Sequence, residues 1–301
     1  MQDKIVSIVT PTYICGKYIH RLLDSVLKQT YPSIEMYVID DGSVDDTKSI
    51  IQDYIPRFAE RGYTLHYNYQ ENQGQSVAIN NGLKMIKGDY LIWPDADDFY
   101  KCDDTIEALV KALDEADEQT GMSRCLLEYL NEDDLSFRRA TKISDEIKDQ
   151  LFEDCLFGIN GFWYCAGACM VTTSALREMI PDLEIYTEHA AGQNWQLMLP
   201  VLYKYKCATV PEVKYSVLLR STSHSRGQFS SRKQTNKRFN GYRNTILETL
   251  KKIPYMPASE LKMYSKKIDD YYDHMIFKNN MIFFLGPLVP VIQRVKKLFK
   301  R

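Results

Sequence analysis

Short apolar runs alternate with amphipathic stretches over the first hundred residues of this 301-residue chain. β-Branched and other apolar residues predict buried strands at 4–9, 34–39, 65–69 and 90–93. Apolar side chains at helical spacing predict helices at 18–29, 47–58 and 75–85. Strands that alternate with helices are typical of βαβ units, so we expect a mostly parallel α/β sheet with helices on both faces.

The pattern is less regular after residue 100. An acidic amphipathic helix is predicted at 103–118, and an apolar helix at 195–205, where Pro200 should kink the helix or lie near its start. The range 157–171 is rich in glycine and aromatic residues and has no clear period. We therefore expect a soft boundary near residue 100 inside one continuous globule.

The composition, 45% apolar and 26% charged, is that of a soluble globular protein. Forty acidic against 38 basic residues give a net charge of -2, so the whole molecule has no electrostatic reason to bind nucleic acid. The seven cysteines form no CxxC pair and have no histidine at zinc-finger spacing, so we expect reduced thiols in a cytosolic protein. The first residues lack the pattern of a cleaved signal, so secretion by that route is not expected.

The C-terminal tail combines an apolar segment with a basic one. Residues 279–293 carry no charge, and five cations follow, namely Arg294, Lys296, Lys297, Lys300 and Arg301. The uncharged segment is shorter than the roughly 20 residues that a membrane-spanning helix needs. Its arrangement favours contact with the headgroups of an anionic membrane surface. The alternative is a terminal helix packed on the domain, with its basic end in solvent.

Two acidic loops follow predicted strands. Asp95-Ala96-Asp97-Asp98 places three carboxylates in four residues, and their repulsion calls for a cation or for screening by water. Oxygen ligands without a nearby histidine or cysteine suit Mg²⁺ or Mn²⁺, which commonly bridge carboxylates to a diphosphate. The alternative is an acidic turn that caps the next helix.

The second acidic loop is Asp40-Asp41-Gly42-Ser43. A carboxylate here is suited to accept hydrogen bonds from a base ring or from ribose hydroxyls, and a plain turn with a helix cap is the alternative. The carboxyl ends of parallel strands meet at one edge of a sheet, where ligands bind. Because neither a GxGxxG nor a GxxxxGK[ST] motif is present, we expect carboxylates and a metal ion to hold a diphosphate there.

These loops belong to an ordered set of motifs that resembles family 2 glycosyltransferases. The set comprises 7–13 (SIVTPTY), 25–32 (SVLKQTYP), 38–45 (VIDDGSVD), 72–82, 88–90 and 95–98. Each motif alone is weak, but six in register over about the first 100 residues are specific. The resemblance implies a GT-A fold, a nucleoside-diphosphate sugar donor, a divalent metal, Mn²⁺ or Mg²⁺, and inversion at the anomeric carbon. The motifs do not identify the donor, and we expect a UDP-sugar, together with a C-terminal helical extension of the fold.

The resemblance also implies roles for individual residues. Pro11, Thr12 and Tyr13 would border the nucleoside, and Asp40 or Asp41 would meet the base. Asp95 would face the ribose or the metal, Asp97 would hold the metal, and Asp98 would support the loop. Two further nucleotide-binding residues are expected before the third helix, at Asn72 and Gly74.

The sequence departs from the family pattern at the acceptor site. The family usually carries an acidic pair before a Trp, whereas this chain has Gly192-Gln193-Asn194-Trp195, and an amide cannot take a proton at neutral pH. Asn194 and Trp195 are still expected at the acceptor site. Glu188 is the predicted catalytic base, with its neighbour His189 or an unidentified group as alternatives. Ile79 is a second departure, because many relatives have Arg there.

A basic stretch follows the acceptor region, and Arg220 to Arg243 contains no acid. His224 is a candidate metal ligand and Arg226 a candidate phosphate ligand, since guanidinium groups suit phosphate. A solvated basic loop is the alternative. We assign residues 1–100 to nucleotide-sugar binding and 101–215 to acceptor binding within one domain. The range 216–278 then holds the basic loop and helices, and 279–301 the membrane-surface tail.

The resulting hypothesis is a glycosyltransferase that acts on a glycan or lipid-linked glycan acceptor in surface-polysaccharide assembly. It would work in the cytoplasm, at the inner face of the cell membrane, without binding nucleic acid. The alternatives are a sugar-nucleotidyltransferase, whose Gly-rich basic N-terminal signature is absent, and a non-catalytic sugar-nucleotide-binding subunit, which the two amides would suit.

Overall fold

The computed structural model describes residues 4–143, 148–187, 192–220 and 231–285. Its strands are β1 (Val6–Thr12), β2 (Ile34–Asp40), β3 (Thr64–Tyr69), β4 (Tyr90–Ile92), β5 (Phe99–Tyr100), β6 (Thr120–Asn131), β7 (Phe137–Ala140), β8 (Cys169–Thr172) and β9 (Lys206–Leu219). The helices are α1 (Gly16–Leu27), α2 (Thr47–Arg61), α3 (Gln75–Leu83), α4 (Thr105–Asp114), α5 (Phe152–Phe157), the 3₁₀ turn η1 (Ala166–Ala168), α6 (Thr173–Met179), α7 (Gln193–Lys204), α9 (Arg232–Lys252) and α10 (Ala258–Leu285).

All described strands belong to one sheet in the order β3-β2-β1-β4-β8-β6-β9-β5, with β7 attached to β6. β1 pairs in parallel with both β2 and β4, and β2 pairs in parallel with β3, as the alternating pattern predicts. Among the later strands, β8 lies antiparallel between β4 and β6 and β5 lies antiparallel on β9, whereas β6 and β9 pair in parallel. The parallel prediction therefore holds for the first four strands, and the sheet as a whole is mixed.

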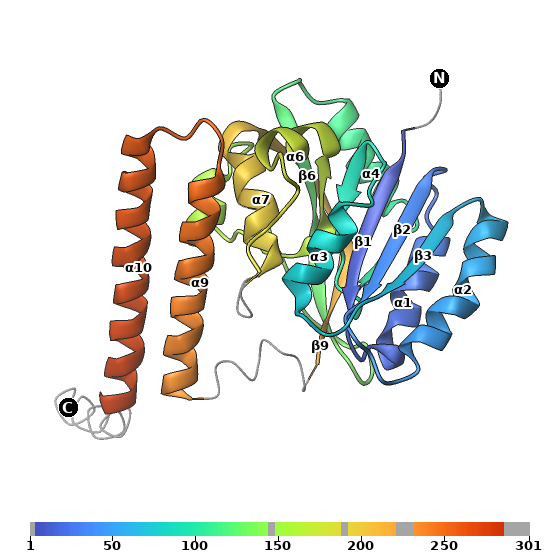
Figure 1. The fold of residues 1–301 in the computed structure, drawn as a ribbon, viewed down its shortest axis with the longest axis horizontal. Coiled ribbons are helices and arrows are strands. Elements are labelled where there is room, and N and C mark those ends of the chain that lie inside the picture. The colour runs from blue at the N-terminus through green and yellow to red at the C-terminus, as the bar shows by residue number, and fades with distance from the viewer. Residues whose placement is uncertain (1–3, 144–147, 188–191, 221–230, 286–301) are drawn as a thin grey trace, which may run out of the picture.

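Two apolar layers cover the two faces of the sheet (Figure 1). Ile8 of β1 faces the layer formed with α1, α2 and α4, whereas the next residue, Val9, faces the layer formed with α3, α6, α7, α9 and α10. This switch between neighbours is the two-residue period of a strand buried on both faces. Ile79, the residue that replaces an expected Arg, is fully buried in the second layer.

The helices α9 and α10 form a long pair at one side of the molecule (Figure 1). Near the end of α10, Phe277 and Ile282 are each 61% exposed. Within the part of the chain that the structure describes, no helix has the length and apolarity required to cross a bilayer. The greater part of the predicted tail, 286–301, lies outside the described residues.

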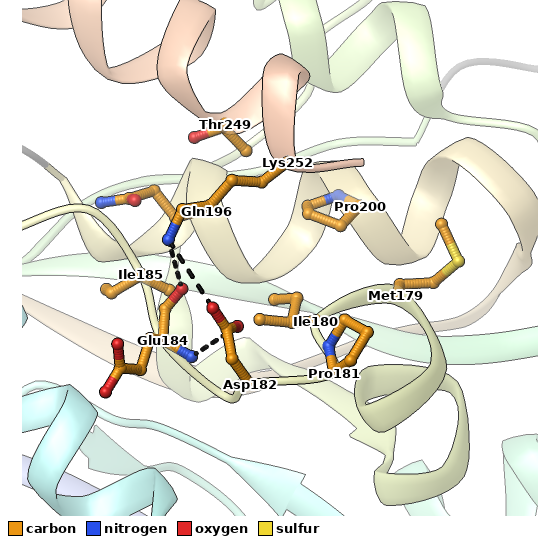
Figure 2. Close-up of a pocket in the computed structure, with 10 residues that line it drawn as sticks. All are labelled: Met179, Ile180, Pro181, Asp182, Glu184, Ile185, Gln196, Pro200, Thr249 and Lys252. Carbon is orange, nitrogen blue, oxygen red and sulfur yellow. Dashed lines mark hydrogen bonds and ion pairs between the residues drawn. The ribbon is translucent and has the colours of Figure 1, made fainter. Parts of the chain in front are cut away.

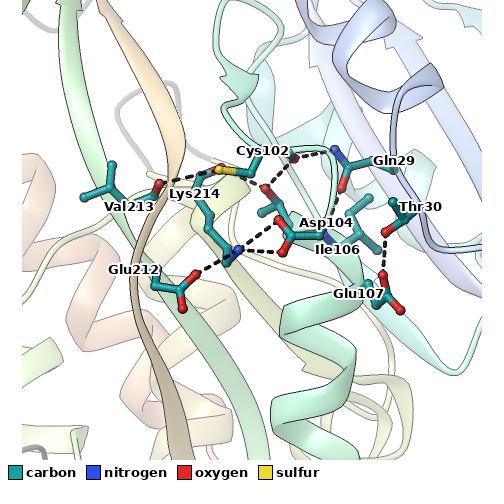
Figure 3. A network of polar contacts seen from close by, with 10 residues as sticks. Gln29, Thr30, Cys102, Asp104, Ile106, Glu107, Glu212, Val213 and Lys214 are labelled. Carbon is teal, nitrogen blue, oxygen red and sulfur yellow. Dashed lines mark hydrogen bonds and ion pairs between the residues drawn. The ribbon is translucent and has the colours of Figure 1, made fainter.

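A polar network holds the segment that follows the acidic loop 95–98 (Figure 3). Gln29 accepts a hydrogen bond from Ile106 N at 2.9 Å and donates one to Cys102 O at 2.9 Å. The buried Lys214 ammonium lies 2.8 Å from an Asp104 carboxylate oxygen and 3.0 Å from Glu212. These contacts hold the start of α4 against α1 on one side and β9 on the other.

Close packing of α3 on β1 requires a glycine at position 82. A Cβ atom there would lie 2.3 Å from Val9 Cγ1 and 3.3 Å from Ile39 Cγ1. We expect Gly82→Ala to lower the free energy of unfolding by about 1 to 3 kcal/mol through overpacking, as measured by urea denaturation. Asn81→Ala at the neighbouring exposed position should change it by less than about 0.5 kcal/mol, and equal effects of the two variants would contradict this account.

Candidate active site at the carboxyl edge of the sheet

The carboxylates of Asp40 and Asp41 organise the loops around them. Asp40 is fully buried and accepts hydrogen bonds from Ser43 N at 2.8 Å and from the Tyr67 hydroxyl at 2.7 Å. Asp41 accepts hydrogen bonds from Gln73 N and Gly74 N, both at 2.8 Å. One acid therefore closes the turn after β2, and the other fixes the turn that leads into α3. Their predicted contact with the base stays a prediction.

The other predicted nucleotide-binding residues surround this edge. Pro11 and Thr12 are buried at the end of β1, where Thr12 pairs with Asp40, while Tyr13 is 52% exposed. Asn72 is exposed, and its backbone N would lie 3.0 Å from a Cβ at Gly42, whose φ of +88° also favours glycine. The fold thus places these residues on neighbouring loops of one edge.

The acidic loop Asp95-Ala96-Asp97-Asp98 is contacted by polar groups from three elements that are distant in the sequence. Asp95 Oδ1 accepts hydrogen bonds from Gln75 Nε2 at 3.0 Å and from Gln193 Nε2 at 3.1 Å. Asp97 Oδ2 lies 2.8 Å from the Nε atom of Arg220, directly after β9. Asp98 is buried and accepts a hydrogen bond from Leu218 N at 3.0 Å, in agreement with its predicted role as a support of the loop.

The electrostatics of this loop favour a bound cation. Burial, followed by the charge of Asp97, raises the pKa of Asp95 to about 7, although the Gln75 bond and Arg220 act in the opposite direction. Burial and the charges of Asp97 and Asp95 also raise the pKa of Asp98 well above its ordinary value. A positive charge beside these groups would stabilise their ionised forms.

The residues present fit a hard divalent metal. Asp95 and Asp97 offer carboxylate oxygens, and the buried Gln193 Oε1 atom has no hydrogen-bond partner among the described residues. Such a donor set matches Mg²⁺ or Mn²⁺, which usually take their other ligands from water and substrate phosphates. Within the described ranges, no group of three or more His, Cys, Asp and Glu side chains is arranged to hold a metal ion.

The amides that replace the expected acidic pair make specific contacts. Asn194 Oδ1 accepts a hydrogen bond from Trp93 Nε1 at 3.2 Å, and Asn194 Nδ2 donates one to Tyr164 O at 3.3 Å. An aspartate could not make the second bond, since an ionised carboxylate only accepts. Trp195 donates a hydrogen bond to Cys155 O at 3.1 Å. Asn194 and Trp195 therefore connect α7 to Trp93, Tyr164 and Cys155. Their predicted contact with the acceptor stays a prediction.

Several predicted residues lie outside the described part of the chain. They are the candidate base Glu188, its neighbour His189, the candidate metal ligand His224 and the candidate phosphate ligand Arg226. A pocket of about 270 Å³ lies elsewhere, between α6, α7 and α9, and none of the predicted site residues lines it (Figure 2).

The sequence does not reveal the polar partners of Asp95 and Asp97. Gln75 stands at the start of a predicted helix, Gln193 stands where the family pattern has an acid, and Arg220 begins a basic stretch. No spacing rule connects residues 20 to 123 positions apart, so only folding could bring them together.

Comparison with known proteins identifies the family of the chain. The family model described as Glycosyl transferase family 2 matches residues 7–178, more than half of the chain. The chain belongs to glycosyl transferase family 2. This assignment confirms the resemblance drawn from the motifs.

Curated relatives match only part of the chain. Glycosyltransferase RT0329 of Rickettsia typhi is 35% identical over 128 residues, which cover 42% of this chain and 38% of that protein. Chondroitin synthase of Escherichia coli is 36% identical over 99 residues, which cover 33% of this chain and 14% of the synthase. The chain thus matches well under half of the length of either relative.

Solved structures match nearly the whole chain and show the fold. S. aureus TarS 1-349 in complex with UDP-GlcNAc has a TM-score of 0.67 at 16% identity, covering 93% of this chain and 75% of TarS 1-349. The mannosyltransferase PcManGT of Pyrobaculum calidifontis, in complex with GDP-Man and Mn²⁺, has a TM-score of 0.54 at 15% identity. The match covers 94% of this chain and 86% of the PcManGT chain. The predicted GT-A fold with flanking and C-terminal helices is confirmed.

The raised pKa of Asp95 predicts a pH dependence of stability. Between pH 3.8 and about 7 the folded chain holds a proton that the unfolded chain has released, so this group lowers stability as pH rises through that window. Asp95→Asn removes the titration and keeps an oxygen acceptor for the two glutamines. We expect the variant to gain stability relative to the natural chain as pH rises from about 4 to about 7, as measured by urea denaturation. Parallel pH profiles would contradict this.

Proposed function

We propose that this protein is a metal-dependent, inverting glycosyltransferase that moves a sugar from a UDP-sugar to a glycan or lipid-linked glycan acceptor. The observation that carries the proposal is the cluster of Asp95, Asp97 and Asp98 at the carboxyl edge, with Arg220 against Asp97. Supporting it, TarS is described with UDP-GlcNAc and PcManGT with GDP-Man and Mn²⁺.

The proposed donor site combines the two acidic loops. A metal ion held by Asp95 and Asp97 would act as a Lewis acid toward the diphosphate leaving group. Arg220 lies at the same loop, so its guanidinium is placed to offset negative charge that develops there. Asp40 and Asp41 hold the neighbouring turns, which would give the nucleoside a fixed wall beside Thr12 and Tyr13.

Inversion requires a base on the face of the sugar opposite the leaving group. Neither Gln193 nor Asn194 can remove a proton at neutral pH, and both amide atoms of Asn194 already bind protein groups. We therefore assign the acceptor proton to Glu188, with His189 as the alternative. This proposal places the base in residues 101–215 and the donor in residues 1–100, and it leaves His224 and Arg226 as further metal and phosphate ligands.

The second part of the proposal is peripheral contact of the tail with an anionic membrane. It is supported by the exposed Phe277 and Ile282 on α10 and by the apolar and basic sequence that follows. Each cation near such a surface contributes about 1 kcal/mol. A lipid-linked acceptor would then meet the enzyme at the inner face of the cell membrane.

A panel of nucleotide sugars tests the reaction through Mn²⁺-dependent release of the nucleotide. With the donor so found, we expect Asp97→Ala to lower kcat/KM by at least about 100-fold, since removal of one group that stabilises developing charge has effects of this size. Asp53→Ala, at an exposed acid of α2, should leave kcat/KM unchanged. Tight UDP binding without turnover, unaffected by Glu188→Gln, would instead indicate a binding subunit.

Removal of residues 279–301 tests the membrane contact. We expect the shortened protein to stay in the supernatant when vesicles that contain phosphatidylglycerol are pelleted, whereas the full chain sediments with them. Nucleotide release should persist in the shortened protein. If it still sediments, or if the full chain binds phosphatidylcholine vesicles equally well, the tail is not an electrostatic anchor.

A further inference from the structure

Arg220 is the cation that faces the acidic loop 95–98. Its Nε atom lies 2.8 Å from Asp97 Oδ2, and within the described ranges no other cationic side chain forms an ion pair with this loop. Both side chains of the pair are 20% exposed, so water screens their charges only in part. Burial, followed by the charge of Asp97, raises the pKa of Asp95 and of Asp98, and the guanidinium charge acts in the opposite direction on both. Arg220 is therefore the counter-ion of the whole loop.

The ion pair between Arg220 and Asp97 is close but poorly aligned. Although 2.8 Å separates the two atoms, the buried Nε–H group of Arg220 has no hydrogen-bond partner among the described residues. The attraction within the pair is thus mainly that of two opposite charges, which depends less on direction than a hydrogen bond does. A buried N–H group without an acceptor also costs free energy. Arg220 would therefore gain from an acceptor that Asp97 does not supply.

The other contacts of this segment permit the side chain of Arg220 to turn. Its guanidinium carbon lies 4.8 Å from the ring centroid of Tyr18, a buried residue of α1. Contact with a ring face does not determine where the individual N–H groups point. The backbone two residues earlier is held, because Leu218 N donates a hydrogen bond to Asp98 at 3.0 Å. The guanidinium can thus leave Asp97 while β9 and α1 keep their places.

A divalent metal and Arg220 compete for the same carboxylate. Two cations that share Asp97 repel each other, and the partial burial of the pair strengthens that repulsion. Gln193, which donates a hydrogen bond to Asp95, offers the loop a buried Oε1 atom that has no hydrogen-bond partner among the described residues. This amide oxygen is neutral, so it adds no charge that would offset the repulsion.

A diphosphate removes the conflict between the two cations. It brings negative charge and several acceptor oxygens, and the planar guanidinium group matches phosphate oxygens in charge and in shape. The Nε–H group of Arg220 would find there the acceptor that it lacks beside Asp97. The carboxylate of Asp97 would then be left to the metal.

We propose that Arg220 is an exchangeable counter-ion, which holds Asp97 in the ligand-free protein and moves to the diphosphate when metal and nucleotide bind together. This inference rests on the proposed function, because it concerns the binding of the same donor and metal ion. Its consequence is thermodynamic. Metal alone binds weakly, since it displaces Arg220 without giving it a new partner, whereas metal and nucleotide strengthen the binding of each other by the same factor.

Replacement of Arg220 should change two affinities in opposite directions. We expect Arg220→Gln to bind Mn²⁺ about 5-fold to 50-fold more tightly without nucleotide, as measured from the electron paramagnetic resonance signal of free Mn²⁺. The same variant should bind UDP about 10-fold more weakly at saturating Mn²⁺, as measured by titration calorimetry. Arg220→Lys keeps the charge, so its Mn²⁺ affinity should stay within about twofold of that of the natural chain.

Arg57→Gln is the matched control for these measurements. Arg57 also lies against an aspartate and a tyrosine ring, with its Nη2 atom 2.9 Å from Asp24 Oδ1 and its guanidinium carbon 4.1 Å from the ring centroid of Tyr54. This pair connects α2 with α1 and includes no residue of the acidic loop. The control variant should therefore change neither the Mn²⁺ affinity nor the UDP affinity.

A double-mutant cycle without metal tests the exchange itself. In EDTA, Asp97→Asn removes the charge that holds Arg220, so we expect this variant to bind UDP about 10-fold more tightly than the natural chain. The gain should disappear when Asp97→Asn is made in the Arg220→Gln protein, because the released guanidinium is its cause. A gain that comes only from lost repulsion between Asp97 and the diphosphate would be the same in both backgrounds.

Several results contradict the inference. Weaker Mn²⁺ binding by Arg220→Gln would mean that Arg220 supports the metal ligands, and unchanged Mn²⁺ binding would make it a phosphate ligand alone. An equal gain in both backgrounds of the cycle would assign that gain to repulsion. If the natural chain turns over no nucleotide sugar, the proposed function fails. The binding measurements then still decide the inference, since none of them requires turnover.

Discussion

The site depends on keeping three carboxylates together at one strand end. Asp95, Asp97 and Asp98 repel one another, and partial burial strengthens that repulsion by removing water. The fold offsets the cost with donors from other elements, chiefly Arg220 and the backbone of Leu218. A cation beside these carboxylates would stabilise their ionised forms further.

The need to support these three carboxylates also explains how the two halves of the chain are joined. The acidic loop lies in the first hundred residues, but its partners come from α3, α7 and the end of β9. Asn80 of α3 and Gln196 of α7 additionally bind the backbone of Ile185 and Tyr186 through hydrogen bonds. The first hundred residues and the later part of the chain are thus linked by hydrogen bonds between polar groups, which are more directional than apolar packing.

Gln193 and Asn194 make hydrogen bonds at two positions where the family usually carries an acidic pair. Asn194 uses both its donor and its acceptor, and Gln193 donates to Asp95 with its oxygen still free among the described residues. An acidic pair at these positions would add negative charge beside an already crowded cluster. The amides avoid that added charge.

The local sequence by itself determined the first strands and helices, because the two-residue and 3.6-residue periods are properties of each segment and the motifs lie on its loops. It did not reveal β6 and β9. Their pairing shifts register several times, so the apolar residues of these strands follow no simple two-residue period. Nor did it reveal the contacts of Arg220 with Asp97 and of Gln196 with Tyr186, since no pattern in the sequence indicates which partner a polar side chain will bind. Only the tertiary structure decides those pairs, because burial forces each polar group to find whichever partner the fold brings within hydrogen-bond distance.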